Sequence, residues 1–197
     1  MPRRYRMEAR SQAVEATRQR IVDAAIKLHA RRGIMATNWQ EIAAEARVSP
    51  ATVYRHFPSL DELIPACART AFEAGARLPT AAEAAAAFAN LPNAFQRLEL
   101  LIRESCRCYE LGAGWLAAAR REAKTIPALD RAVRLQDRAL DLLIAAALAD
   151  VRVDRESRAL VKALIDFPFW SALIDAGIDP QKIPRVICEL AASRLKL

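Results

Sequence analysis

The chain has 197 residues, 53% of them hydrophobic and 27% charged, which is enough to bury a sizeable core. Its 30 Lys and Arg residues against 23 Asp and Glu give a net charge of +7. The N-terminus is charged, and the longest apolar run, residues 142–149, is far shorter than a bilayer requires. We therefore expect a cytoplasmic protein with no secretory signal and no membrane partner.

The positive charge is concentrated at one end of the chain. Residues 1–60 hold 11 Lys and Arg against 5 Asp and Glu, whereas residues 61–197 hold 19 against 18. A basic segment followed by a near-neutral one predicts a head that binds a polyanion and a body with a different task.

The first predicted elements are a polar arm and a helix. Residues 1–16 carry four arginines, Arg3, Arg4, Arg6 and Arg10, and form either a frayed arm or an extension of the helix that follows. From Thr17 the apolar residues take helical spacing, and Gly33 is placed to end this helix.

Two short helices follow in quick succession. Asn38 and Glu41 have the spacing of a capping box, which predicts the start of the second helix. A tight turn at residues 46–49 leads to Ser49 as a cap and Pro50 as the first residue of the third helix. Three helices with a short turn before the third predict a helix-turn-helix unit.

The remaining chain is predicted to be helical, because Ala and Leu dominate and no alternating β-branched runs appear. A helix over 60–76 is expected to bend at Pro65 and to connect the head to the body. The Gly112–Gly114 segment is expected to break a helix, whereas Pro168 is expected to lie inside one. The later helices are expected over 80–91, 93–111, 115–124, 127–151, 154–177 and 180–195.

The segment Thr37–Leu63 resembles the DNA-binding domain of the TetR family. The similarity is strongest at Val48-Ser49 and over Thr52–Ser59, and it extends over about residues 17–63. It implies an all-α fold of about nine helices. Residues 1–16 would be a basic arm, 17–63 a helix-turn-helix domain, and 64–197 a ligand-binding and dimerisation domain.

The resemblance also implies which residues meet DNA. In the family, the start of the third helix contacts bases, and the Tyr and His near its end contact phosphates. For Tyr54 alone, packing is the alternative role. Transferred by position, the predicted DNA-binding residues are Gln40, Ser49, Pro50, Ala51, Thr52, Tyr54, Arg55 and His56.

Three positions depart from the family pattern. Arg47 stands where Gly is usual, which predicts a left-handed backbone at a cost of about 1–2 kcal/mol. Leu60 stands where Lys is common, and the neighbouring Asp61 would repel phosphate, so the arginines of the arm would have to compensate. His29 replaces an aromatic residue and is expected at the edge of the core with a hydrogen bond.

The body of the protein offers a candidate ligand cavity and a dimer interface. The aromatic residues expected at the cavity, with ordinary core packing as the alternative, are Phe88, Tyr109, Trp115, Phe167 and Trp170. The last two predicted helices are apolar on more than one face, which predicts a homodimer built on them.

These features together predict a transcriptional regulator. The expected function is sequence-specific binding of a palindromic operator on double-stranded DNA, with repression relieved by a small, largely apolar ligand. The alternative is a ligand-independent architectural or adaptor protein that keeps the helix-turn-helix.

An enzyme is not expected. His29 and His56 are the only histidines, and no catalytic or phosphate-binding motif appears, so no cofactor or metal is predicted. The four cysteines, Cys67, Cys106, Cys108 and Cys188, are either small buried hydrophobes or a redox sensor.

Overall fold

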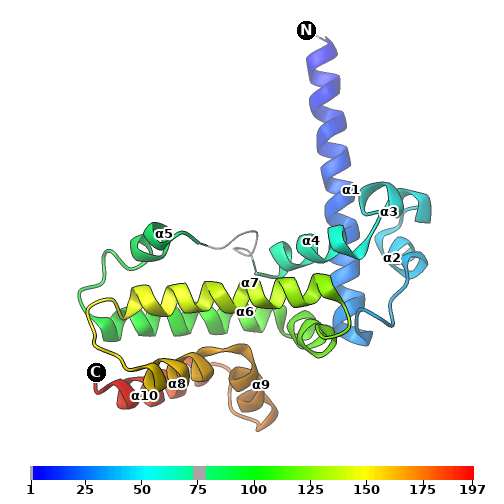
Figure 1. Ribbon diagram of the computed structural model, residues 1–197. Coiled ribbons are helices and arrows are strands. Elements are labelled where there is room, and N and C mark those ends of the chain that lie inside the picture. The colour runs from blue at the N-terminus through cyan, green and yellow to red at the C-terminus, as the bar shows by residue number, and fades with distance from the viewer. Residues whose placement is uncertain (1, 73–78) are drawn as a thin grey trace. The chain divides into compact units, whose positions relative to one another are not determined.

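The computed structural model describes residues 2–72 and 79–197, with side chains described from Arg10 to Ala71 and from Pro79 onward. These residues form ten helices and no strand, and the predicted all-α fold is confirmed. None of the helices in the described ranges has the length and apolarity to cross a membrane. The helices are α1 Pro2–Arg32, α2 Trp39–Ala46, α3 Pro50–His56, α4 Leu60–Phe72, α5 Ala81–Ala86, α6 Ala94–Glu122, α7 Pro127–Ala147, α8 Arg155–Ile165, α9 Phe167–Asp175 and α10 Ile183–Leu195 (Figure 1).

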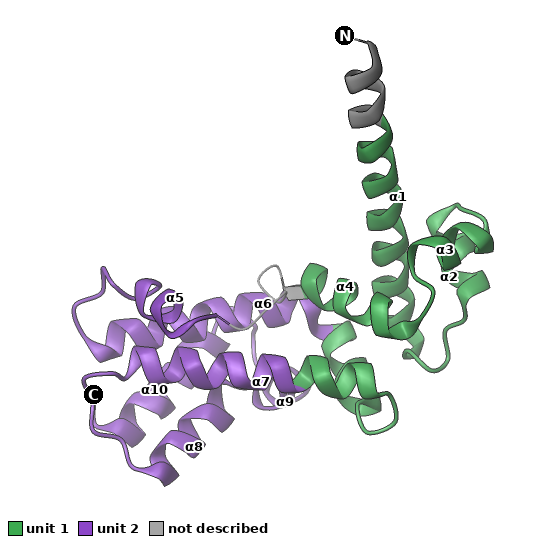
Figure 2. Cartoon of the chain, turned by 45° about the horizontal axis from the view of Figure 1, so that its top comes forward, with its two compact units in different colours: residues 1–76, 114–133 green, residues 77–113, 134–197 purple. Residues whose placement is uncertain are grey.

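The chain divides into two compact units, shown in different colours in Figure 2. Unit 1 comprises residues 1–76 and 114–133, and unit 2 comprises residues 77–113 and 134–197. Both α6 and α7 contribute residues to each unit. The sequence predicted a single covalent connection between the two parts of the chain, through residues 60–76. In the structure the chain also passes from one unit to the other within α6 and again within α7.

The core of unit 1 joins α1 to the helix-turn-helix. α1 packs against both α2 and α4, and α2 packs against α3. Ile21, Val53 and Phe57 are completely buried in one hydrophobic cluster. Because a helix of this size is stabilised mainly by its buried apolar face, this cluster fixes the position of α3 against α1.

The N-terminal arm continues α1 as a helix. α1 begins at Pro2, so residues before Thr17 take the helical alternative rather than the frayed one. The side chains of residues 10–16 are exposed, and those of Arg3, Arg4 and Arg6 lie outside the described residues.

The predicted helix break at Gly112–Gly114 is wrong, because α6 is continuous over Ala94–Glu122. A Cβ atom added at Gly114 would lie only 2.7 Å from the Cβ of Ala30 on α1. Gly114 therefore permits a close helix crossing, and its cost within a helix is only about 1 kcal/mol.

The prediction of one helix over 154–177 is also wrong, since α8 ends at Ile165 and α9 begins at Phe167. Asp166 lies between them with φ −66° and ψ 153°, and its carboxylate accepts a 2.8 Å hydrogen bond from the Phe167 backbone N–H. Pro168 falls at the start of α9. It lacks the N–H that a continuous helix would need there, so the chain stops and restarts the helix.

Unit 2 ends in three helices, of which α8 packs against both α9 and α10. Val161, Ile165 and Ile187 are buried on the inner faces, whereas Leu160 on α8 and Leu190 on α10 remain 44% and 46% exposed. Both helices thus carry apolar residues on a second, uncovered face, as the sequence predicted.

Three of the four cysteines are buried, and Cys108 is half-buried. Burial raises the pKa of Cys67 and of Cys106 to about 12, and it raises the pKa of Cys188 as well. A thiol must ionise to react with an oxidant, so these three behave as small hydrophobes.

Candidate nucleic-acid interface

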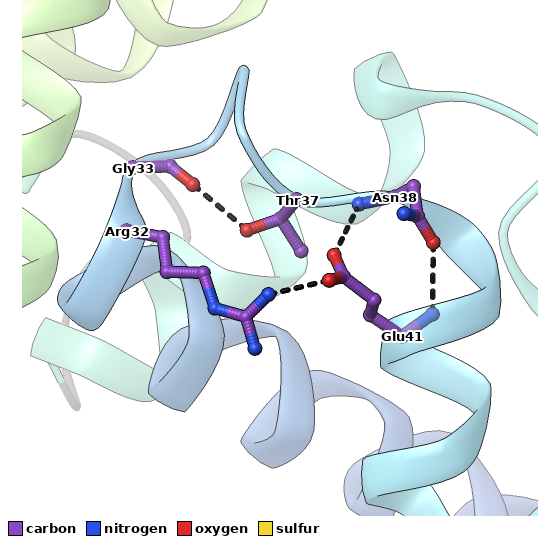
Figure 3. Close-up of polar contacts among 5 residues, drawn as sticks. All are labelled: Arg32, Gly33, Thr37, Asn38 and Glu41. Carbon is purple, nitrogen blue, oxygen red and sulfur yellow. Dashed lines mark hydrogen bonds and ion pairs between the residues drawn. The ribbon is translucent and has the colours of Figure 1, made fainter.

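The loop between α1 and α2 is held by an interlocking set of polar contacts (Figure 3). The Asn38 side chain accepts a 2.9 Å hydrogen bond from the Glu41 N–H, and the Glu41 carboxylate accepts one of 3.1 Å from the Asn38 N–H. Arg32 pairs with the same carboxylate, and the Thr37 hydroxyl donates to the Gly33 carbonyl. The predicted capping box is therefore confirmed, and it fixes where α2 begins.

The turn between α2 and α3 has the backbone that the sequence predicted. Arg47 adopts φ 55° and ψ 49°, the left-handed conformation expected where related chains have Gly. Ser49 then caps α3, because its Oγ accepts a 3.1 Å hydrogen bond from the Thr52 N–H. The same Oγ lies 2.9 Å from the Thr52 hydroxyl, which holds that side chain at the start of the helix.

The candidate DNA-binding residues lie on α2, on the turn before α3 and on α3, and each is at least partly exposed. Ser49, Pro50 and Ala51 are exposed at the start of α3, while Val53 and Phe57 face the core. Gln40 on α2 and Arg55 on α3 are exposed as well, and Thr52 and His56 are half-buried. Small side chains at the start of a helix allow its backbone to approach the edges of bases closely.

Tyr54 packs its ring against α2 and remains partly exposed. Its ring centroid lies 5.4 Å from that of Trp39 on α2, yet the residue is 46% exposed.

His56 is the other candidate phosphate ligand. Its pKa is lowered first by burial and then by the positive charges of Arg55 and Arg18, while Glu15 acts in the opposite direction. These effects favour the neutral form of the His56 imidazole over the charged form.

Arg18 is a positioning residue that the sequence analysis missed. Its guanidinium donates a 3.1 Å hydrogen bond to the His56 carbonyl and lies 4.1 Å from the centroid of the Phe57 ring. A cation at the C-terminal end of α3 satisfies a carbonyl that the helix itself leaves free. Because the two residues are 38 positions apart in the chain, no local pattern could have indicated this contact.

Glu122, at the end of α6, is a second missed residue. Its carboxylate accepts hydrogen bonds from the backbone N–H groups of Ile34, at 3.2 Å, and Met35, at 2.7 Å. The loop that precedes α2 is thereby tied to a residue 87 positions later in the chain. Gly33 has φ +93°, a backbone conformation that other residues adopt only under strain, and a Cβ there would lie 2.2 Å from a Glu122 oxygen unless that side chain moved.

The expectation that His29 lies at the edge of the core is wrong. The residue is 1% exposed, in the core rather than at its edge, and its Nδ1 has no hydrogen-bond partner within the described part of the chain. Burial lowers the pKa of His29 to about 4, against a smaller opposing effect of the Glu122 charge. His29 is therefore neutral near pH 7.

Asp61 has a partner that reduces its repulsion of phosphate. Its carboxylate lies 2.5 Å from a guanidinium nitrogen of Arg131, in the segment of unit 1 that follows α6. Both side chains are exposed, so this pair adds little to stability. The positive charge of Arg131 instead offsets the negative charge of Asp61 at the start of α4, just after α3 in the chain.

Comparison with known proteins agrees with this geometry. Residues 21–67 match the family described as "Bacterial regulatory proteins, tetR family". This segment of the chain is thus similar to the DNA-binding domain of the TetR family.

Solved structures extend the similarity over most of the chain. A transcriptional regulator from Rhodococcus sp. Rha1 has a TM-score of 0.70 at 18% identity, covering 91% of this chain and 96% of its own. A TetR-family member from Streptomyces coelicolor A3 has 0.62 at 26% identity, covering 88% and 97%. The multidrug binding protein EbrR has 0.59 at 26% identity, covering 88% and 93%. The resemblance predicted from residues 17–63 is thus confirmed, and the fold of the second unit is shared as well.

The aromatic residues proposed for a ligand site fall into separate groups. Tyr109, Phe167 and Trp170 form one cluster in unit 2, with ring centroids 5.6 to 5.9 Å apart. Trp115 belongs instead to the hydrophobic core of unit 1. Phe88 is buried and lies just beyond α5 in the chain.

The left-handed Arg47 of this regulator gives a testable prediction about stability. We expect Arg47→Gly to raise the free energy of unfolding by about 0.5–1 kcal/mol. Relief of the left-handed strain, about 1–2 kcal/mol, is partly offset by the greater freedom of glycine in the unfolded chain. Arg47→Ala removes the same charge but keeps the strain, so it should give no gain in urea unfolding. Equal midpoints for the two variants would contradict this account.

Proposed function

We propose that this TetR-family regulator is a cytoplasmic, homodimeric repressor that binds a palindromic operator and is released by a small, largely apolar ligand. The observation that carries the proposal is the exposed start of α3. There Ser49 and Thr52 hold each other in place beside the small residues Pro50 and Ala51. A dimer would place two such helices in successive major grooves, which is why the operator would be palindromic.

The proposal assigns different roles to the residues of α3. Pro50 and Ala51 would make apolar contacts with thymine methyl groups. Thr52, with Gln40 or Arg55, would form the polar contacts to base edges. Tyr54 and His56 would donate hydrogen bonds to phosphates, whose positions carry no sequence information.

The second unit would bind the ligand and the partner subunit. Residues 64–197 would form this domain and 17–63 the DNA-binding domain. The cluster of Tyr109, Phe167 and Trp170 supports an aromatic or apolar ligand, with Phe88 and Trp115 as further candidates. Two structures of EbrR, in complex with imidazole and with proflavin, support ligands of this kind in a relative of 26% identity.

The division of roles on α3 can be tested with Tyr54→Phe, which removes only the hydroxyl and leaves the ring on Trp39. Loss of one charge-assisted hydrogen bond per subunit should weaken binding by about tenfold or more on every sequence. The measurement is binding to a duplex selected by the wild-type chain from random-sequence DNA, and to single-base variants of that duplex.

Thr52→Val is the matched comparison, because it should change which bases are preferred. A switch in sequence preference caused by Tyr54→Phe would contradict the assignment. Failure of the wild-type chain to select any sequence would overturn the proposed function itself.

A further inference from the structure

The N-terminal half of α1 faces the recognition helix across a groove. α1 runs for 31 residues, but its core contacts begin only near Ile21. Residues four and three positions apart lie on the same face of a helix. On α1 that face presents, in order, Arg10, Val14, Thr17 and Arg20 to the groove.

The opposite wall of the groove is the start and the outer side of α3. It consists of Val48, Ser49, Thr52, Arg55 and His56. The groove has a volume of about 370 Å³ and is open to solvent. A smaller set of the same residues, Arg10, Val14, Arg55 and His56, lines an adjoining hollow.

The groove is lined by basic side chains with apolar surface between them. Arg10, Arg20 and Arg55 contribute three exposed guanidinium groups. Glu15 is the acidic group that acts on His56, but it does not line the groove. Val14, which is 49% exposed, adds an apolar surface between the cations. Alternating cations and small apolar surface suit the phosphates and deoxyriboses of a nucleic acid strand.

We propose that the groove between α1 and α3 binds the sugar–phosphate backbone of one DNA strand, beside the bases that α3 contacts. The inference rests on the proposed function, and it deepens it by adding a second DNA-binding site on α1. Ser49 and Thr52 belong to both the groove and the base-reading edge, so an occupant of the groove lies next to the bases.

The length of the groove fits a short run of nucleotides. Arg10 and Arg20 are ten residues apart, which is about 15 Å along a helix. This span lets the two arginines reach different phosphates of the same strand. Each arginine neutralises one phosphate and releases a counterion, and the contact adds affinity without sequence preference.

The test is the double variant Arg10→Gln/Arg20→Gln, bound to the duplex that the wild-type chain selects from random-sequence DNA. Two lost phosphate contacts per subunit should reduce the log–log dependence of affinity on salt by roughly 2 to 4. Sequence preference should stay the same. A hydroxyl-radical footprint should lose protected sugars in each half-site.

Arg103→Gln is the control, since it removes an exposed arginine from α6 and should change the slope by less than about 0.5. If the wild-type chain binds its duplex but the double variant has the same salt slope and the same footprint, the groove proposal is wrong while the proposed function stands. The groove would then bind a different polyanion or no ligand. A change in base preference would overturn it too. If the wild-type chain selects no sequence, the proposed function fails instead.

Discussion

Replacing Leu160 by Asp is expected to turn the protein into a monomer of 21.8 kDa and to lower operator affinity by more than about a hundredfold. Leu160 is 44% exposed on α8, and Leu190 is 46% exposed on α10, which packs against α8. In the proposed dimer both leucines meet the partner subunit. A carboxylate buried there without a partner would destabilise the dimer by several kcal/mol, and a dimer would contain two such carboxylates.

The loss of affinity follows from the two half-sites of the operator. Once one recognition helix is bound, the second binds at a high effective concentration, and a monomer lacks this advantage. Light scattering at low micromolar concentration and binding to the selected duplex measure the two effects.

Leu111→Asp provides the control for this experiment. Leu111 is 67% exposed on α6, outside the two helices concerned, so this variant should remain dimeric. A wild-type chain that is monomeric at low micromolar concentration would contradict the proposed dimer. A dimeric Leu160→Asp variant with full operator affinity would show that the interface lies elsewhere.

The second large effect is a pH dependence of stability that arises from His29. Its pKa is about 4 in the folded protein and about 6.5 in the unfolded chain. Between these values the unfolded state binds more protons than the folded state, so stability falls as the pH falls. The full difference amounts to roughly 3 kcal/mol, and most of it is lost by pH 4.5.

His29→Leu should remove this dependence, because leucine has no titrating group and fills a similar volume. Its Nδ1 has no partner to lose, so the substitution should cost little at pH 7. Urea unfolding of the wild-type protein and of His29→Leu at pH 7 and pH 4.5 isolates the contribution of His29 to stability, since the other groups titrate equally in the two proteins. If the two stabilities fall in parallel, His29 is not the cause.

The sequence by itself determined the elements that depend on neighbouring residues. Asn38 and Glu41 lie one helical turn apart, so the capping box could be predicted without any knowledge of the tertiary structure. The same holds for Ser49 with Pro50 and for the left-handed Arg47. The helix-turn-helix follows from these local signals, which is why this part of the fold and its resemblance to the TetR family were predicted correctly.

Tertiary structure decided the features that depend on residues far apart in the chain. Gly112–Gly114 looked like a helix break, but the close approach of Ala30 to Gly114 favours a continuous α6. The contacts of Arg18 with α3 and of Glu122 with the α1–α2 loop join residues at least 38 positions apart. The groove beside α3 also exists only because packing of the core brings α1 and α3 together. Such contacts leave no periodic trace in the sequence, because each depends on where the rest of the chain has been placed.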